Sequence, residues 1–226
     1  MTEQGTPVRL TNPFAAVRDV DGHVLDVPEY QAGFDRDHAL CAEPMWKLER
    51  AQDFYEPDVA SWRAMMDGDW AGSLELADRM AAPVAEFFRH RVPVRRVRVV
   101  EFPITAYLQW EMHVLALRAQ AGSPCRVLPA ARVADLDPAP ELVIFSPSLM
   151  YEVLYDRYGG GRGGRRISDP EVVSPCLRLV QELFAEGEDV LDFHEREILP
   201  LPPPVVTDEM RAALPAYAHR TEEFRV

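Results

Sequence analysis

The sequence of 226 residues contains a single lysine, Lys47, against 23 arginines. A P-loop that binds nucleotide phosphates needs a Gly-Lys-Ser/Thr sequence, so this shortage excludes that motif. No stretch of 18 consecutive apolar residues occurs, and we therefore expect no helix that crosses a membrane. The first thirty residues lack the basic segment and the following apolar segment of a secretory signal, so we expect no export.

Cysteine is also scarce. Cys41, Cys125 and Cys176 are odd in number and far apart in the sequence, which argues against a disulfide framework and for a reducing compartment. We therefore expect the protein in the cytoplasm. The 24 basic residues are outnumbered by 37 carboxylates, which gives a net charge of −13. Such a chain repels polyanions at long range, so its charge disfavours a nucleic-acid partner.

Sequence motifs for catalysis and for metal binding are missing. There is no G-x-S-x-G sequence and no cysteine in a known catalytic context. His194 and Glu195 lack the second histidine of an H-E-x-x-H site. His38 and Cys41 are three residues apart, but no second pair follows at metal-ligand spacing. We expect no catalytic residue, no metal and no cofactor, and we favour a protein that is not an enzyme.

A glycine-rich segment at 159–164 satisfies the pattern G-x-G-x-x-G through Gly159, Gly161 and Gly164. A dinucleotide site requires a strand before this pattern and a helix that opens inside it. Here an expected strand precedes the pattern and the sequence RRISD (165–169) follows as another expected strand. The segment is therefore predicted to be the turn of a hairpin.

Apolar periodicity predicts a mixed chain. Alternation predicts strands at 94–102, 125–130, 141–147, 149–158 and 165–169, with a further candidate at 46–50. Spacings of three and four predict helices within 56–70, 71–91, 104–122 and 170–198, the second of them kinked or divided at Pro83. This order is typical of an α/β or α+β domain in which helices pack on a mixed sheet of about five or six strands.

The chain divides by composition into three parts. Residues 1–45 are predicted to form an N-terminal arm with a hairpin around Asp21-Gly22 and at most one or two helical turns after it. Residues 46–198 are predicted to form one α/β domain, mostly helical over 46–92 and containing the sheet and two helices over 93–198. Residues 199–226 begin with a proline-rich linker and continue into a tail helix, for which Thr207 is the expected N-cap.

Two arginines on the strongest strand are the first candidate site. Arg96 and Arg98 share one face of the strand, and buried guanidinium groups need partners. The following helix carries Tyr107, Glu111, Val114 and Arg118 on one stripe. Glu111 is the expected partner of Arg98 or Arg96. The cluster is then either a structural ion pair between helix and sheet or a ligand pocket at the end of the strand.

A second candidate lies in the sequence WKLER at 46–50. Trp46 and Arg50, with Lys47 and Glu49 between them, combine an aromatic ring with alternating charges. Exposed, this segment would be a contact surface for a ligand or partner; buried, it would anchor the packing. We favour packing and keep Trp46 and Arg50 as candidate ligand residues.

Several segments resemble a family of actinobacterial domains of unknown function. The resemblance extends over roughly residues 45–195 and is most specific in R-V-R-V-V…P…Y…E, here Arg96 to Val100 with Pro103, Tyr107 and Glu111. The chain departs from the family pattern at Gly122-Ser123-Pro124, where the family has Gly-Glu, and at 144–148, where the family has an aspartate-rich sequence. Members often lie beside helix-turn-helix regulators, which implies a regulatory accessory protein.

The strand order is also similar to half of a phospholipase-D-like fold. Enzymes with that fold use the motif H-x-K-x(4)-D, whereas Lys47 follows Trp46 and has no histidine two residues before it. This resemblance therefore implies the fold without its catalytic motif.

Two functions follow from the sequence. The leading hypothesis is a non-catalytic regulatory or protein-interaction protein of a bacterial signalling or transcription system, with a protein partner such as a helix-turn-helix regulator. The alternative is a protein that binds a small anionic molecule, or an enzyme acting on one, through a pocket of Arg, Tyr and Glu residues. The sequence indicates no oligomeric state.

Overall fold

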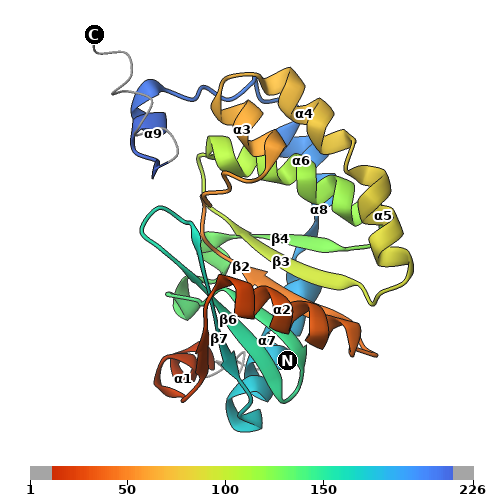
Figure 1. The fold of residues 1–226 in the computed structure, drawn as a ribbon, viewed down its shortest axis with the longest axis vertical. Coiled ribbons are helices and arrows are strands. Elements are labelled where there is room, and N and C mark those ends of the chain that lie inside the picture. Colours follow the sequence, from red (N-terminus) through yellow and green to blue (C-terminus); the bar gives the residue numbers. More distant parts are fainter. Residues whose placement is uncertain (1–11, 216–226) are drawn as a thin grey trace, which may run out of the picture.

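One mixed sheet organises the protein in the computed structural model, which describes residues 12–215. The order of its eight strands is β1-β7-β6-β5-β2-β3-β4-β8 (Figure 1). Strands β2, β3 and β4 are parallel, and the other neighbouring pairs are antiparallel. The strands are β1 (His23–Leu25), β2 (Met45–Glu49), β3 (Val94–Val100), β4 (Cys125–Pro129), β5 (Leu142–Ser146), β6 (Leu149–Tyr155), β7 (Gly161–Ile167) and β8 (Glu188–Asp189). The predicted mixed sheet packed by helices is confirmed, with eight strands instead of five or six.

Helices cover both faces of this sheet. They are α1 (Phe14–Asp19), α2 (Val27–Ala39), α3 (Ala60–Met66), α4 (Trp70–Asp78), α5 (Ala81–Arg89), α6 (Ala106–Gln120), α7 (Pro170–Glu186), α8 (Val190–Phe193) and α9 (Asp208–Ala212), with a π-helical turn at His194–Ile198. None of the helices within residues 12–215 is both long and apolar enough to cross a membrane.

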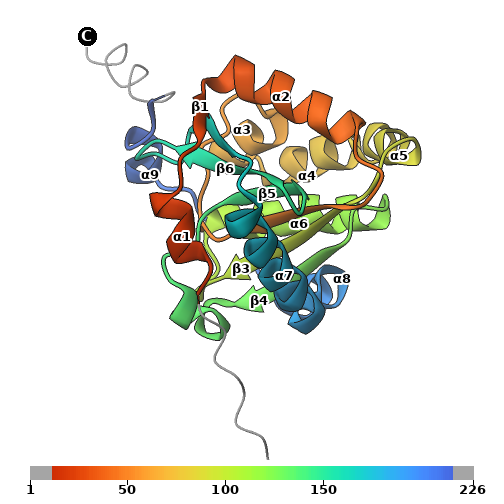
Figure 2. The ribbon, with the colours of Figure 1, turned by 90° about the horizontal axis from the view of Figure 1, so that it is seen from below.

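The two central layers of the core lie on opposite faces of β3. Val97 and Val99 belong to the apolar cluster that contains the buried side chains of α7, and Figure 2 shows α7 lying along the sheet. Val100 instead packs with Leu108 and Met112 of α6. This alternation follows from the two-residue period of a strand. It leaves the remaining positions on the α6 face, at 96 and 98, for charged residues.

Helix α6 connects β3 to its parallel neighbour β4. The Thr105 hydroxyl accepts a hydrogen bond from the backbone N–H of Leu108 at 3.1 Å and so caps the start of the helix. Gly122, with φ of 98°, adopts a left-handed conformation just after the helix ends. The helix predicted over 104–122 is therefore confirmed with slightly narrower bounds.

The N-terminal region differs from the prediction. No hairpin forms around Asp21-Gly22, because β1 pairs with β7, which is far away in the sequence. Alternation on both sides of a turn does not identify the partner strand, and here the partner is remote. Helix α2 follows with 13 residues instead of one or two turns. Asp26 and Glu29 form a capping box at its start, which fixes where the helix begins.

The glycine-rich segment joins two antiparallel strands, β6 and β7, so the predicted hairpin is confirmed. Strand β7 begins four residues earlier than expected and includes several of the glycines. Gly163 has φ of 101°, and a Cβ atom there would lie 2.1 Å from the Leu25 carbonyl oxygen. Glycine thus allows the backbone of β1 to approach β7 closely.

The predicted helix over 170–198 is wrong as one element. Helix α7 ends at Glu186, and two extended residues form β8 beside β4 before the chain becomes helical again at Val190. The predicted division at Pro83 is also misplaced, since α4 ends at Asp78 and α5 starts at Ala81. Proline is tolerated in the first turn of a helix because its missing N–H would have no helical acceptor there.

The C-terminal segment packs against the helical side of the molecule. Thr207 caps α9 by accepting from the N–H of Met210, as predicted. Val206 and Leu214 pack against the aromatic cluster around Trp62. The rest of the predicted tail helix, and the first eleven residues of the predicted arm, lie outside the described residues.

Candidate functional site

Charged side chains occupy the face of the sheet that α6 covers. In the parallel register of β2 and β3, Lys47 lies opposite Arg96 and Glu49 lies opposite Arg98. Because side chains alternate along a strand, these four point to the same face. Glu49, Arg96 and Arg98 are all buried. Charges so remote from water must be compensated inside the protein.

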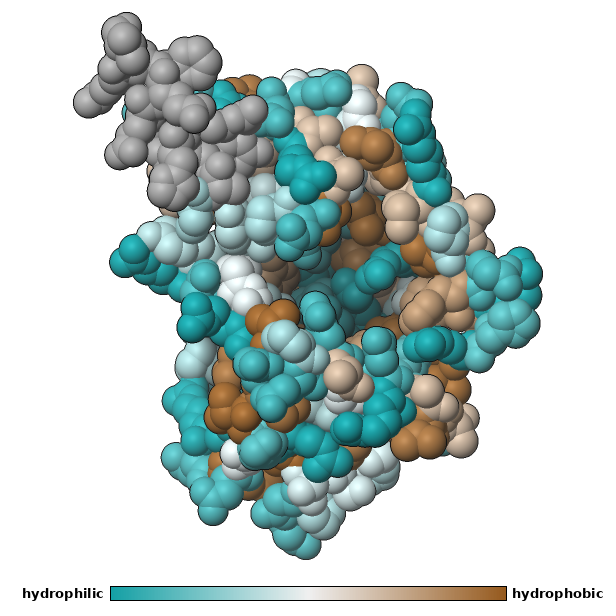
Figure 3. Space-filling model, in the orientation of Figure 1, coloured by the Kyte–Doolittle hydropathy of each residue, from teal (hydrophilic) through white to brown (hydrophobic). Residues whose placement is uncertain are grey.

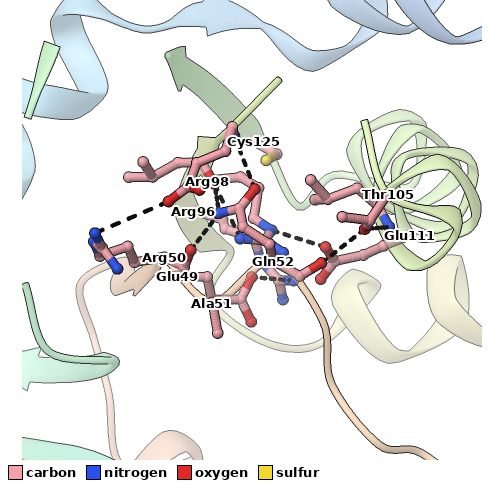
Figure 4. A network of polar contacts seen from close by, with 12 residues as sticks. Glu49, Arg50, Ala51, Gln52, Arg96, Arg98, Thr105, Glu111 and Cys125 are labelled. Atoms are coloured by element: carbon pink, nitrogen blue, oxygen red, sulfur yellow. Dashed lines mark hydrogen bonds and ion pairs between the residues drawn. The ribbon is translucent and has the colours of Figure 1, made fainter. Parts of the chain in front are cut away.

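Arg98 is compensated by Glu111. The Arg98 Nε donates a hydrogen bond to Glu111 Oε2 at 2.7 Å, and its Nη1 donates to the carbonyl oxygen of Val99 at 3.1 Å. Figure 4 shows the two side chains pointing toward each other between β3 and α6. The Arg98 guanidinium carbon also lies 5.7 Å from the centre of the Phe54 ring. The helix-to-sheet ion pair expected from the sequence is present.

Arg96 has a different partner. Its Nη1 lies 2.8 Å from Glu49 Oε2, in ion-pair contact although without a well-aligned hydrogen bond. The other carboxylate oxygen of Glu49 contacts the Lys47 ammonium group. Burial alone would raise the pKa of Glu49, but the charges of Arg96 and Lys47 outweigh it and lower that pKa to about 2. Glu49 is therefore ionised at neutral pH and holds two cations in place.

Backbone contacts fix the end of β2 beside this cluster. Glu141 Oε1 accepts hydrogen bonds from the backbone N–H groups of Arg50 at 2.8 Å and Ala51 at 2.7 Å. The Gln52 side chain then donates to the carbonyl oxygen of Val99 at 3.1 Å. These contacts tie the ends of β2 and β3 together and orient the charged face of both strands.

A cavity of about 340 Å³ opens over the charged face. Figure 3 shows it as a hollow in the middle of the molecule, with hydrophilic residues deep inside and hydrophobic residues on its walls. Its polar and aromatic lining comes from the two strands, the β2–α3 loop, α6 and β6: Lys47, Glu49, Phe54, Glu56, Arg96, Tyr107, Trp110, Glu111, Arg118 and Tyr155. Helices α4 and α5 and the turn between them add Ala77, Met80, Ala81 and Val84. Sites of this size accommodate small molecules.

Two charged groups in the cavity lack a counter-ion contact. Across the described residues, neither Glu56 nor Arg118 is joined to another residue by an ion pair or side-chain hydrogen bond. Burial, and then the Glu111 carboxylate, raise the pKa of Glu56 to about 7. Burial, and then the Arg96 guanidinium, lower the pKa of Arg118. Both shifts are those of charges withdrawn from water without a close partner.

The sequence-predicted set around β3 is brought together only in part. Arg96, Tyr107 and Glu111 line the cavity, whereas Arg98 lies beneath it in its pair with Glu111. Burial, and then the Glu111 charge, raise the pKa of Tyr107 well above its ordinary value, so its hydroxyl stays protonated. The helical stripe that also includes Arg118 was predicted from the sequence, although Arg118 was not among the candidate residues.

Trp46 and Arg50 lie away from the cavity. The Trp46 ring packs on the α7 face, with the Phe184 ring at 5.4 Å and the Arg95 guanidinium carbon at 5.1 Å from its centre. The Arg50 side chain pairs with Asp137 at 2.5 Å. Trp46 therefore anchors packing, as favoured from the sequence, and Arg50 ties the end of β2 to a loop.

Several lining residues were not selected from the sequence. Lys47 and Glu49 could have been found, since alternation along 45–49 separates them from Trp46 and from Leu48. Glu56 and Tyr155 had no signal, because a loop and a hairpin strand bring them to the cavity from distant positions. Trp110 could have been found one turn before Val114 on the helix.

The described residues contain no group of three or more His, Cys, Asp or Glu side chains arranged to hold a metal ion. A histidine pair lies outside the cavity, where α6 meets the π-helical turn. His194 Nε2 and His113 Nδ1 are 2.8 Å apart. The three cysteines at 41, 125 and 176 are free thiols.

Together, the fold and the site define a mixed α/β domain with an open cavity that has charged residues deep inside and apolar residues on its walls. The chain belongs to the family described as Domain of unknown function (DUF6879), whose profile matches residues 32–195. The expectation of a domain family of unknown function is thus confirmed. No curated protein matches the sequence significantly.

A remote likeness exists among solved structures. TrmBL2, an archaeal chromatin protein that binds DNA, matches with a TM-score of 0.41 and 11% sequence identity. The match covers 74% of this chain and 52% of that chain, so this chain spans about half the length of TrmBL2. A likeness at this level carries no inference about function.

Proposed function

We propose that the protein binds a small molecule in the cavity between the β2–β3 face, α6 and helices α3 to α5, and that it does so without catalysing a reaction. One observation carries this proposal: the cavity of about 340 Å³ contains two charged side chains, Arg118 and Glu56, that no other described residue pairs. Both side chains are half-buried, and a charge that is partly withdrawn from water without gaining a partner destabilises a protein. A ligand that supplies the missing counter-charges would remove that cost.

The paired residues support binding rather than reaction. Arg96 and Glu49 compensate each other, and Arg98 compensates Glu111. Groups held in such pairs are fixed in position, and their charges determine the electrostatic potential inside the cavity. The charged lining is balanced, with three cationic side chains against three carboxylates. Because Glu49 holds Lys47 and Arg96, Arg118 is the cation left for an anionic group of a ligand, as in the alternative hypothesis from the sequence.

A regulatory role in the cytoplasm, through a protein partner, is retained as a second proposal. The observation that favours it is the contact between the C-terminal segment and the cavity wall. Phe54 and Tyr155 line the cavity and belong to the same aromatic cluster as Val206 and Leu214 of that segment. A ligand that moves those rings would change the surface that a partner, such as a helix-turn-helix regulator, could contact.

A thermal-shift screen tests the binding proposal. Wild-type protein, Arg118→Met and the control Arg79→Met are screened against carboxylates, phosphates, nucleotides and sugars. Arg79 is exposed and, within residues 12–215, pairs with Glu75 on α4. We expect at least one ligand to stabilise the wild type and the control but not Arg118→Met. If every ligand that stabilises the wild type stabilises Arg118→Met equally, the cavity is not the binding site.

The regulatory proposal has a separate test. A candidate partner protein is captured with the full chain and with a chain that ends at residue 198. We expect capture to need residues 199–226 and to change when a cavity ligand from the first screen is added. Equal capture by both chains, unaffected by that ligand, would exclude the C-terminal segment as the link.

A further inference from the structure

The two unpaired charges of the cavity have opposite sign and come from different elements. Arg118 lies in the last turn of α6, and Glu56 lies in the loop between β2 and α3. Both line the same cavity. Each influences the titration of the other through space, although no ion pair joins them. The cavity thus offers one cationic and one anionic side chain that are not paired with each other.

The remaining ionised groups cannot take these roles. The Glu49 carboxylate is shared between Arg96 and Lys47. The Glu111 carboxylate is held by Arg98. A ligand carboxylate at Arg118 and a ligand cation at Glu56 would therefore meet uncommitted partners. A guanidinium group also matches a carboxylate in two parallel hydrogen bonds.

Aromatic residues form much of the rest of the lining. Phe54 and Tyr155 stack with ring centres 4.7 Å apart, and Tyr107 lies at 5.4 Å from Trp110. The Trp110 indole N–H is buried and has no acceptor in the described part of the chain. Because the rings of each pair contact each other, they favour a flat apolar group beside them.

We infer that the cavity binds a small aromatic zwitterion, with its carboxylate at Arg118, its ammonium group at Glu56 and its ring against the aromatic lining. This inference rests on the proposed function and narrows its ligand class. A zwitterion satisfies both uncommitted charges, whereas a simple acid leaves Glu56 unpaired and a simple amine leaves Arg118 unpaired. Leaving a buried polar group unpaired is what allows a site to reject close analogues.

Matched probes separate these cases. Phenylalanine and tryptophan are compared with 3-phenylpropionate and indole-3-propionate, which lack the ammonium group, and with phenethylamine and tryptamine, which lack the carboxylate. Affinities are measured by calorimetric titration at about pH 8, where the probe amines are largely protonated. We expect at least one zwitterion to bind about tenfold or more tightly than its own acid and its own amine.

Two variants assign the charges. Arg118→Met is expected to weaken the binding of both the zwitterion and the acid by about tenfold or more. Glu56→Gln is expected to weaken the binding of the zwitterion by about tenfold and to change the affinity for the acid by less than about threefold. Arg79→Met serves as the exposed control. If either cavity variant fails to fold, Arg118→Lys and Glu56→Asp replace it, because they keep the charge but displace it.

The outcomes distinguish this inference from the proposed function. If the acids bind as tightly as the zwitterions and Glu56→Gln changes neither, the site takes anions and the zwitterion inference is wrong while the binding proposal stands. If none of the six probes binds the wild type, the aromatic zwitterion is also excluded. The broader thermal-shift screen then decides whether the cavity binds any ligand.

Discussion

Arg98 Nε donates a 2.7 Å hydrogen bond to Glu111 Oε2 at a position where the arginine has no exposed surface. The pair joins the central strand β3 to helix α6. It lies directly under the cavity, whose wall includes Glu111. The geometry of the candidate site therefore depends on a contact that is also part of the core.

Removing one partner of this pair is expected to destabilise the fold strongly. Arg98→Met leaves the buried Glu111 carboxylate uncompensated, at a cost of about 3–5 kcal/mol in the free energy of unfolding. The double variant Arg98→Met with Glu111→Leu removes both charges and should recover much of that loss. Urea denaturation of the three proteins measures the difference. Equal losses in the single and double variants would show that the ion pair is not the source of the effect.

Glu56 should make stability depend on pH in an unusual direction for a carboxyl group. Its pKa is raised from 4.5 to about 7, so the folded state binds the proton more tightly than the unfolded state. The contribution to stability is complete below 4.5 and is lost as pH rises through about 7. Glu56→Gln should therefore stabilise the ligand-free protein by about 1–3 kcal/mol at about pH 8 and hardly at all at about pH 4.

The exposed carboxylate Glu75 provides the control for this measurement. Denaturation of wild type, Glu56→Gln and Glu75→Gln is followed across the pH range. A gain for Glu56→Gln that is the same at both ends of the range would contradict the assignment of a raised pKa to Glu56.

The pair His113 and His194 should make the folded protein less stable at acid pH. Burial, and then the neighbouring His194, lower the pKa of His113 from 6.5 to about 4, and burial lowers that of His194. Because the unfolded chain takes up a proton near pH 6.5 and the folded protein only near pH 4, acid favours the unfolded state. The stability that neutral His113 gives above pH 6.5 is therefore lost as the pH falls toward about 4. NMR titration of the imidazole signals checks the shift directly. The loss of stability over this pH range should be smaller in His113→Leu than in the wild type. If the dependence of stability on pH is the same in both proteins, the histidine pair is not its cause.

The C-terminal segment is expected to be held by few contacts. Arg211 Nη1 donates to the carbonyl oxygens of Met66 at 2.9 Å and Val206 at 3.2 Å. Gln109 Nε2 donates to that of Pro202 at 2.9 Å. Arg211→Gln should cost about 1 kcal/mol of local stability and raise amide hydrogen exchange over residues 199–215. Arg79→Gln should leave that exchange unchanged; unchanged exchange in Arg211→Gln as well would mean that other contacts hold the segment.

The parts of the fold that the sequence predicts well are those with a strong local period. Alternation along 94–100 identifies β3, and spacings of three and four identify α6. Once these two elements are adjacent, the need to compensate a buried charge predicts that Glu111 pairs with Arg98 or Arg96, and the structure shows that the partner is Arg98. The stripe that carries Tyr107 and Arg118 follows from the same helical period.

What the sequence does not predict depends on contacts between distant segments. The partner of Arg96 is Glu49 because β2 and β3 are parallel neighbours in one particular register, and register is not visible in either strand alone. Glu56 reaches the cavity through an irregular loop. The interruption after Glu186 depends on β8 pairing with β4, a contact of two residues that leaves no periodic signal.

The short strands β1 and β8 also determine how this protein can meet copies of itself. They form the two borders of the sheet and contain three and two residues. A border strand exposes unpaired backbone groups that could template addition of a strand from another molecule, and short border strands offer few of them. Another copy of this chain would therefore find few backbone groups to pair with at these two border strands, which disfavours edge-to-edge growth of the sheet.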